Sequence, residues 1–561
     1  MDRRSFLKGG KKSASDQIQQ RERLPVFRTS SGLSAYTGPW TKVQATHLLK
    51  RTMFGATLDD ISYFSSKTMN EAVDELLQPT APLPAPPLKE YSVTGALVPD
   101  NDVPVGATWV NNVNNDGTIQ SLRRASLKKW WVGCMLNQDR SIREKMTLFW
   151  HNHFATESVD VSNANFLYKH VNLLRTRALG NFKQLVRDVT LDPAMLIYLN
   201  GRLNTATAPD ENYARELQEL FTLGKENDPN YTEADVKAAA RVLTGWQVNN
   251  TISTFPSYFT SSRHDANSKT FSSFYNNTVI TGRTGSTAGD LELNDLLNMI
   301  FSKQLEVSRF MARKIYRFFV YYEIDAATEA NVIEPMASLL RSGNWDVLPA
   351  LRALFKSEHF YEVINQGCMI KAPLDHVVGL CREWGVVFPD AVNEFVDAYG
   401  MWNTILSAAA SYQQNLGDPP SVAGWPAYYQ VPQFYELWVN TDTLPKRNQV
   451  SDIMIGNGYT RNGKKIVIDA VAFTKKLANP GDPNLLINEV FDQLFQIDVS
   501  QQSKDQLKKD FLLTGQDQDY YWTNAWSAYI ASPTTTNFNI VNTRLRGLYK
   551  YCMNLAEYQL M

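Results

Sequence analysis

REKMTLFWHNHF, residues 143–154, is the most distinctive amphipathic stretch of this 561-residue chain. At the helical repeat of 3.6 residues its large apolar side chains share one face with His153, while His151 points to the opposite side. An unbroken helix would therefore keep the two imidazoles from binding one metal ion, whereas a helix that ended near residue 151 would allow it. His153 is interpreted either as a core histidine held by hydrogen bonds or as a ligand or base oriented by hydrophobic walls.

Helical periodicity continues on both sides of this stretch. Helices are predicted from Trp40 to Arg51, over 58–77, repeatedly through 120–250, and again after residue 291. Few stretches alternate apolar and polar residues, so the chain is predicted to be mainly α, with many helices around a single large core. Residues 250–290 break the pattern and are predicted to form a long irregular loop with at most a small hairpin.

Composition excludes several classes of protein. The 56 lysines and arginines and 57 aspartates and glutamates leave a net charge of −1, so no overall charge favours nucleic acid or an anionic membrane. No apolar run approaches the roughly 20 residues that a membrane span needs. The four cysteines form no CxxC pair, which argues against a disulfide scaffold or a thiolate zinc site. The sequence also lacks the G-x-S-x-G, P-loop and dinucleotide-binding motifs of common hydrolases and nucleotide-binding proteins.

The N-terminus carries a twin-arginine-like motif, DRRSFLK, at residues 2–8. A working export signal would continue with about 7–15 apolar residues, but the next residues are GGKKSASDQ. Residues 1–35 are therefore predicted to be a mobile leader on a protein that stays in the cytoplasm, with the periplasm as the alternative. Residues 36–561 are predicted to form one helical domain, in which a proline-rich connection near 79–107 is an insertion or a lid.

Two further segments place polar groups where chemistry could occur. In PDENYARELQELFTLG, residues 209–224, Glu216 borders the buried face of a predicted helix. Such a carboxylate is either a salt-bridge partner of an arginine, or a metal ligand or general base. In SRHDANSK, residues 262–269, His264 and Asp265 lie in a predicted loop, which is either a solvated turn or part of a site.

A third segment, GDPPSVAGWP at residues 417–426, combines three prolines and two glycines with a tryptophan. These residues favour a rigid turn that fixes the position of the aromatic ring. The turn is interpreted as a structural staple, with a platform for a substrate as the alternative.

These segments resemble the bacterial family called domain of unknown function 1800. The resemblance is carried by HLLKRTMFGAT, FWHNHF, DPAM, ENYAREL, YTEADVKAAAR, His264-Asp265 with Lys269, and PPSVAGWP. It covers nearly everything after residue 40. The resemblance implies a mainly α-helical protein, often exported, and a partner from a sulfatase-like family, domain of unknown function 1501; it implies no particular reaction.

The leading hypothesis is a metal-dependent enzyme, hydrolytic rather than redox, with a mixed His/carboxylate site. His153 and His264 would be nitrogen ligands, with His151 in reserve. Glu216 would be an oxygen ligand or general base, and Asp265 a carboxylate that ligates or orients an imidazole. Such donors suit zinc, manganese or iron, which would activate water to attack a small substrate. The alternative is a noncatalytic helical scaffold or binding protein that acts with the sulfatase-like partner.

Overall fold

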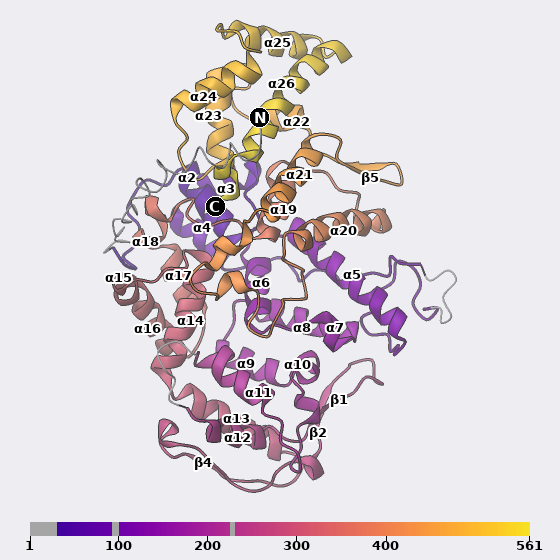
Figure 1. Ribbon diagram of the computed structural model, residues 1–561, viewed down its shortest axis with the longest axis vertical. Coiled ribbons are helices and arrows are strands. Elements are labelled where there is room, and N and C mark those ends of the chain that lie inside the picture. The colour runs from indigo at the N-terminus through magenta and orange to yellow at the C-terminus, as the bar shows by residue number, and fades with distance from the viewer. Residues whose placement is uncertain (1–30, 93–99, 225–230) are drawn as a thin grey trace, which may run out of the picture.

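The computed structural model describes residues 31–92, 100–224 and 231–561. The mainly α prediction is confirmed, because helices follow one another along most of these ranges and their strands form only three short antiparallel pairs (Figure 1). The twin-arginine-like motif lies outside the described residues. None of the described helices is long and apolar enough to cross a membrane.

The helices have the following bounds. Up to residue 242 they are α2 (Lys42–Thr52), α3 (Leu58–Ser65), α4 (Met69–Leu76), α5 (Gly117–Leu136), α6 (Arg143–His153), α7 (Ser158–Val161), α8 (Ala164–Thr176), α9 (Phe182–Thr190), α10 (Pro193–Tyr198), α11 (Asn212–Glu216) and α12 (Glu233–Val242). From residue 288 they are α13 (Ala288–Phe301), α14 (Gln304–Phe319), α15 (Ala326–Thr328), α16 (Glu334–Ser342), α17 (Leu348–Phe355), α18 (Glu358–Tyr361), α19 (Pro373–Glu383), α20 (Phe395–Ser411), α21 (Thr443–Ile455), α22 (Ala470–Lys475), α23 (Pro483–Leu494), α24 (Gln501–Leu507), α25 (Tyr520–Ala531) and α26 (Thr535–Asn554).

Polar residues cap these helices where the periodic pattern begins. Thr41 and Gln44 form a capping box at the start of α2. The side chain of Asp192 accepts hydrogen bonds from the first free N–H groups of α10, and Pro193 occupies the first turn, where its missing N–H costs nothing. Local sequence therefore specifies where these helices start.

The described residues contain three short strand pairs, whereas at most one small hairpin is predicted from the sequence. The strands pair as β1 (Trp246–Val248) with β2 (Ser257–Phe259), β3 (Lys269–Thr270) with β4 (Val279–Ile280), and β5 (Tyr459–Arg461) with β6 (Lys464–Ile466). The first two pairs lie in and beside the predicted irregular region. The third is closed by Asn462-Gly463, both at positive φ, which is the dipeptide that favours a tight hairpin turn.

Buried apolar side chains of the described residues form two clusters rather than a single core. One is built mainly from α2–α4, α9, α12–α14 and α16–α17, the other mainly from α5, α8 and α19–α26. Helix α6 contributes Met146 and Trp150 to the first and Leu148 to the second. All of its eleven residues are buried, so it is covered on every side instead of presenting one polar face to solvent.

Several buried polar side chains of α6 reach a partner from a distant segment. Lys145 forms an ion pair with Asp375 of α19. The side-chain carbonyl of Asn152 accepts the backbone N–H of Trp425. Buried polar groups are tolerated when they are paired in this way. These pairs fix α6 relative to both clusters.

Contacts between distant parts of the sequence also tie down the start of the described chain. The N–H of Glu358 donates to the carbonyl of Ser34 at 2.8 Å, so the last residues of the predicted leader contact the helical body. In α2, Nζ of the buried Lys50 donates to the carbonyls of Gln493 at 3.1 Å and Leu494 at 2.8 Å, at the end of α23.

Candidate functional site

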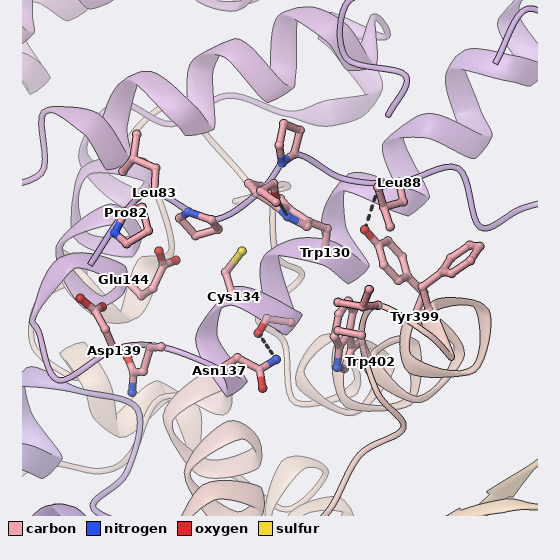
Figure 2. Close-up of a pocket in the computed structure, with 18 of the residues that line it drawn as sticks. Pro82, Leu83, Leu88, Trp130, Cys134, Asn137, Asp139, Glu144, Tyr399 and Trp402 are labelled. Carbon is pink, nitrogen blue, oxygen red and sulfur yellow. Dashed lines mark hydrogen bonds between the residues drawn. The ribbon is translucent and has the colours of Figure 1, made fainter. Parts of the chain in front are cut away.

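A cavity of about 640 Å³ lies between the proline-rich segment 81–88, helix α5 and the start of α20 (Figure 2). Its walls include Pro82, Pro84 and Pro86 from the first, Trp130, Gly133 and Cys134 from the second, and Phe395, Tyr399 and Trp402 from the third. We call it the proline-walled pocket. Its volume lies within the range of roughly 300–1,000 Å³ that is typical of small-molecule sites.

The proline wall is held by hydrogen bonds from neighbouring elements. Closely spaced prolines remove donors and disfavour a helix, so the segment is extended and its carbonyls need outside partners. Nε1 of Trp130 donates to the carbonyl of Ala85 at 2.7 Å. Nη2 of Arg143 donates to the carbonyl of Ala81 at 2.7 Å. The segment predicted as a connection is thus a fixed wall of a cavity.

The opposite wall depends on close packing between α5 and α20. A Cβ atom on Gly133 would lie 2.7 Å from the ring of Trp402, so only glycine allows this approach. The rings of Tyr399 and Trp402 lie 4.8 Å apart between centroids. The hydroxyl of Tyr399 also accepts the N–H of Leu88 at 2.9 Å, which joins this wall to the proline segment (Figure 2).

Charged groups gather at one end of the pocket, where Figure 2 places Glu144 and Asp139 beside Pro82. Glu144 accepts two hydrogen bonds from Arg175, at 2.6 Å from Nε and 3.0 Å from Nη2, and both side chains are buried. Burial alone would lower the pKa of Arg175, but the carboxylate of Glu144 raises it above its usual value. Arg175 therefore stays charged opposite the carboxylate of Glu144, so this end of the pocket is polar and Arg175 offsets the charge of Glu144.

Cys134 points its thiol into the pocket between the prolines and Trp130 (Figure 2). Burial raises the pKa of this thiol well above its usual value. Because the thiolate is the reactive form, Cys134 contributes a small apolar surface at neutral pH instead of a nucleophile.

His153, the first predicted ligand, lies elsewhere, in the core. Its Nε2 donates to the carbonyl of Phe221 at 3.0 Å, in the π-helical turn Leu217–Thr222 that follows α11. Burial, assisted by the charge of Lys314, lowers its pKa to about 3. The imidazole is therefore neutral at ordinary pH, and its geometry is that of a hydrogen-bonded core residue.

His151 points away from His153, because α6 continues to residue 153 instead of ending near 151. Its ring packs edge-on against Trp131 and Trp425, with centroid distances of 5.1 and 5.8 Å. Neither ring nitrogen has a hydrogen-bond partner among the described residues, and burial lowers the pKa to about 3. The condition under which both histidines could bind one ion is not met.

His264 and Asp265 belong to a third place in the fold. Nδ1 of His264 donates to the carbonyl of Thr244 at 2.9 Å, and Nε2 lies 3.1 Å from the carboxylate of Glu292. Asp265 forms an ion pair with Arg241 at 2.6 Å. Burial opposes ionisation of Asp265, but the arginine and nearby amides lower its pKa to about 2. Each group thus has its own partner.

Glu216 is the last residue of α11 and is half-buried. Tyr198 and Tyr231 have raised pKa values through burial and neighbouring carboxylates, Glu216 among them. Across the described ranges, no three His, Cys, Asp or Glu side chains form a group that could hold a metal ion. The predicted joint site of His153, Glu216 and His264 is therefore not assembled in this structure, and the two histidines have separate partners, the carbonyl of Phe221 for His153 and the carbonyl of Thr244 for His264.

The pocket residues were missed by sequence reasoning, which selected polar groups on single segments. The lining comes mainly from residues within 81–88, 130–144 and 391–402, which are separated by up to about 300 residues and which no local sequence pattern links. One usable signal was the run of prolines at 82–87, since such a run must be supported by aromatic or donor groups elsewhere in the chain.

The fold and the pocket together define a large helical protein with a preformed cavity of small-molecule size. Over residues 47–560 the sequence matches the family described as "Protein of unknown function (DUF1800)", and the chain belongs to this family. No curated protein and no solved structure matches it.

Proposed function

We propose that this protein binds a small, mainly apolar molecule in the proline-walled pocket. The observation that carries the proposal is the arrangement of the lining: prolines and aromatic rings form the long walls, and the charged groups gather at one end. Apolar walls favour ligands that leave water, and a few convergent polar groups orient them.

The polar end favours a hydrogen-bond donor on the ligand. Ionised carboxylates accept hydrogen bonds and cannot donate them, and Asp139 and Glu144 both line this end. Arg143 and Arg175 already balance their charge. A hydroxyl or amine N–H group therefore suits this end better than an anionic headgroup.

Entry is supported by the rim. Leu83 and Val392 line the pocket and are 41% and 77% exposed. Exposed apolar side chains at a cavity mouth are common at ligand sites. A ligand that enters past these exposed side chains would leave water and contact the aromatic walls.

The binding test uses N-phenyl-1-naphthylamine, a neutral aromatic probe with one N–H donor whose fluorescence rises when it leaves water. Titration of the full chain is expected to saturate at one equivalent. Ala391→Trp places an indole in the pocket wall and is expected to weaken binding at least tenfold.

Val387→Trp is the matched control, since Val387 lies in the same loop, is 79% exposed and does not line the pocket. It should bind the probe within twofold of wild type. Failure of the wild type to bind, or equal binding by both tryptophan variants, would overturn the proposal.

The metal-dependent hydrolase remains a separate hypothesis with its own test. Elemental analysis of the purified chain and of a His153→Ala, Glu216→Ala double variant would support it if the wild type holds a stoichiometric zinc, manganese or iron ion that the folded variant lacks. The sulfatase-like partner is suggested only by the family resemblance. Co-purification of the two proteins is the test of this partnership.

A further inference from the structure

A second cavity, of about 470 Å³, lies where the end of α20 meets the loops around Asp418 and Gln430. Its polar lining differs from that of the proline-walled pocket, because it consists of amides and one carboxylate. These side chains are Gln413, Asn415, Gln430, Asn440 and Asp418. Trp425 and Trp438 border the cavity but are almost fully buried, so Pro420, Pro426 and Leu437 supply most of its apolar lining. We call this cavity the amide pocket.

The turn that carries Trp425 is held in place from behind. The side chain of Asn152 in α6 accepts the N–H of Trp425 at 2.9 Å. Gly424 has φ +90°, and a Cβ atom there would overlap Asn152, so the turn requires glycine. The segment interpreted from sequence as either a staple or a platform is thus stapled to α6 while its tryptophan contributes to a cavity.

Asp418 is also fixed before any ligand arrives. It accepts the N–H of Ser158 at 2.7 Å and the amide of Asn415 at 2.8 Å, and it forms an ion pair with Lys128. Burial would raise the pKa of Asp418, but these partners hold it below its usual value. Because Lys128 balances the carboxylate, the pocket offers no net charge to a ligand.

The amides supply what a hydroxyl-rich ligand needs. Each amide offers both a donor and an acceptor, and each sugar hydroxyl can also do both. Within the described part of the chain, the exposed side-chain amides of Gln413 and Gln430 form no hydrogen bond to another protein group. Gln413 itself is held at φ +75°, a strained backbone conformation of the kind that clusters at binding sites.

We propose that the amide pocket is a second ligand site, which binds a neutral, polyhydroxylated molecule of the oligosaccharide class. Sugar hydroxyls would exchange hydrogen bonds with the amides and Asp418, and the apolar C–H face of a pyranose ring would pack on the proline and leucine side chains of the lining. This site lies on residues different from those of the proline-walled pocket and does not depend on the function proposed for it.

The test is saturation-transfer NMR on the full chain with three neutral probes: maltotetraose, cellotetraose and N,N′,N″,N‴-tetraacetylchitotetraose. Transfer to the ring protons of at least one probe is expected. Ala410→Trp fills the pocket from α20 and should weaken binding of that probe at least tenfold. Ser407→Trp, on the exposed surface of the same helix, should leave affinity within twofold.

Folding of both variants is checked by circular dichroism and by binding of N-phenyl-1-naphthylamine at the other pocket, so that loss of sugar binding is distinguished from loss of structure. The proposal is overturned if wild type shows transfer to none of the three probes, or if Ala410→Trp binds as tightly as Ser407→Trp.

Discussion

The side-chain oxygen of Asn152 accepts the backbone N–H of Trp425 at 2.9 Å, across 273 residues of sequence. Asn152 lies in a helix that is buried on every side, and Trp425 lies in a turn rich in proline and glycine. The bond therefore joins the most central helix to the wall of the amide pocket. Several polar side chains of α6 have this role of joining distant segments.

Asn152→Ala is expected to lower the free energy of unfolding by about 1–3 kcal/mol, because it leaves the N–H of Trp425 buried without a partner. Urea unfolding followed by fluorescence measures the loss. Asn403→Ala, on the exposed side of α20, is the control and should change stability by less than about 0.5 kcal/mol. Equal stability of wild type and Asn152→Ala would mean that water replaces the lost acceptor.

Arg175→Met is expected to destabilise the fold by about 3–5 kcal/mol, since it leaves the buried carboxylate of Glu144 uncompensated. Adding Glu144→Gln in the same chain removes that charge and should recover part of the loss. Thermal and urea unfolding of the single and double variants measure this coupling. If Glu144→Gln gives no recovery, the loss comes from packing of Arg175 on Trp130 and not from the ion pair.

Trp130→Phe and Trp402→Phe form a matched pair within the proline-walled pocket. Both remove an indole, but only Trp130 Nε1 has a hydrogen-bond partner in the described structure, the carbonyl of Ala85. Trp130→Phe should therefore cost about 1 kcal/mol more stability than Trp402→Phe. Chemical unfolding gives the difference, and the reverse order would show that the Ala85 contact does not hold the wall.

His151→Phe is expected to remove part of the acid sensitivity of the protein. The folded pKa of His151 is about 3, below the ordinary 6.5, so between these values the unfolded chain binds a proton that the folded chain does not. Stability is therefore lost as pH falls below 6.5, by about 1.4 kcal/mol per unit for one histidine. Relative to wild type, the variant should gain about 2 kcal/mol between pH 7 and pH 5.

His170→Phe is the comparison variant for His151→Phe, because His170, unlike His151, has hydrogen-bond partners for both ring nitrogens. Both ring nitrogens of His170 lie 3.2 Å from acceptors, Asp192 and the carbonyl of Phe154. Its replacement should destabilise the fold already at pH 7, whereas His151→Phe should not. Unfolding at pH 7, 6 and 5 compares the two; a large loss at pH 7 in His151→Phe would indicate that its nitrogens are bound to water or a ligand.

Helix positions could be predicted from sequence because they depend on local periodicity and caps. The amphipathic stretch 143–154 corresponds to α6, and the helices predicted through 120–250 include α8, α9 and α12. The hairpin at 459–466 was missed although Asn462-Gly463 carries its signal, since its strands are only three residues long.

The surroundings of α6 could not be predicted in the same way. Periodicity identified the apolar face, but burial of the other face depends on Arg175, Asp375 and Trp425, which no local pattern links to it. For the same reason polar residues near a core were interpreted as ligands. Their partners are a carbonyl for His153 and an arginine for Asp265.

The contact between Lys50 and the end of α23 has a consequence for biosynthesis. The ammonium of Lys50 reaches the carbonyl of Leu494 only after a further 444 residues have been made. At bacterial or eukaryotic elongation rates this takes roughly 20–90 s. During this time α2 has been synthesised, but the carbonyl acceptors at the end of α23 have not. Nascent chains of this protein therefore expose an unfinished interior for most of their synthesis, and holding chaperones have ample time to bind it.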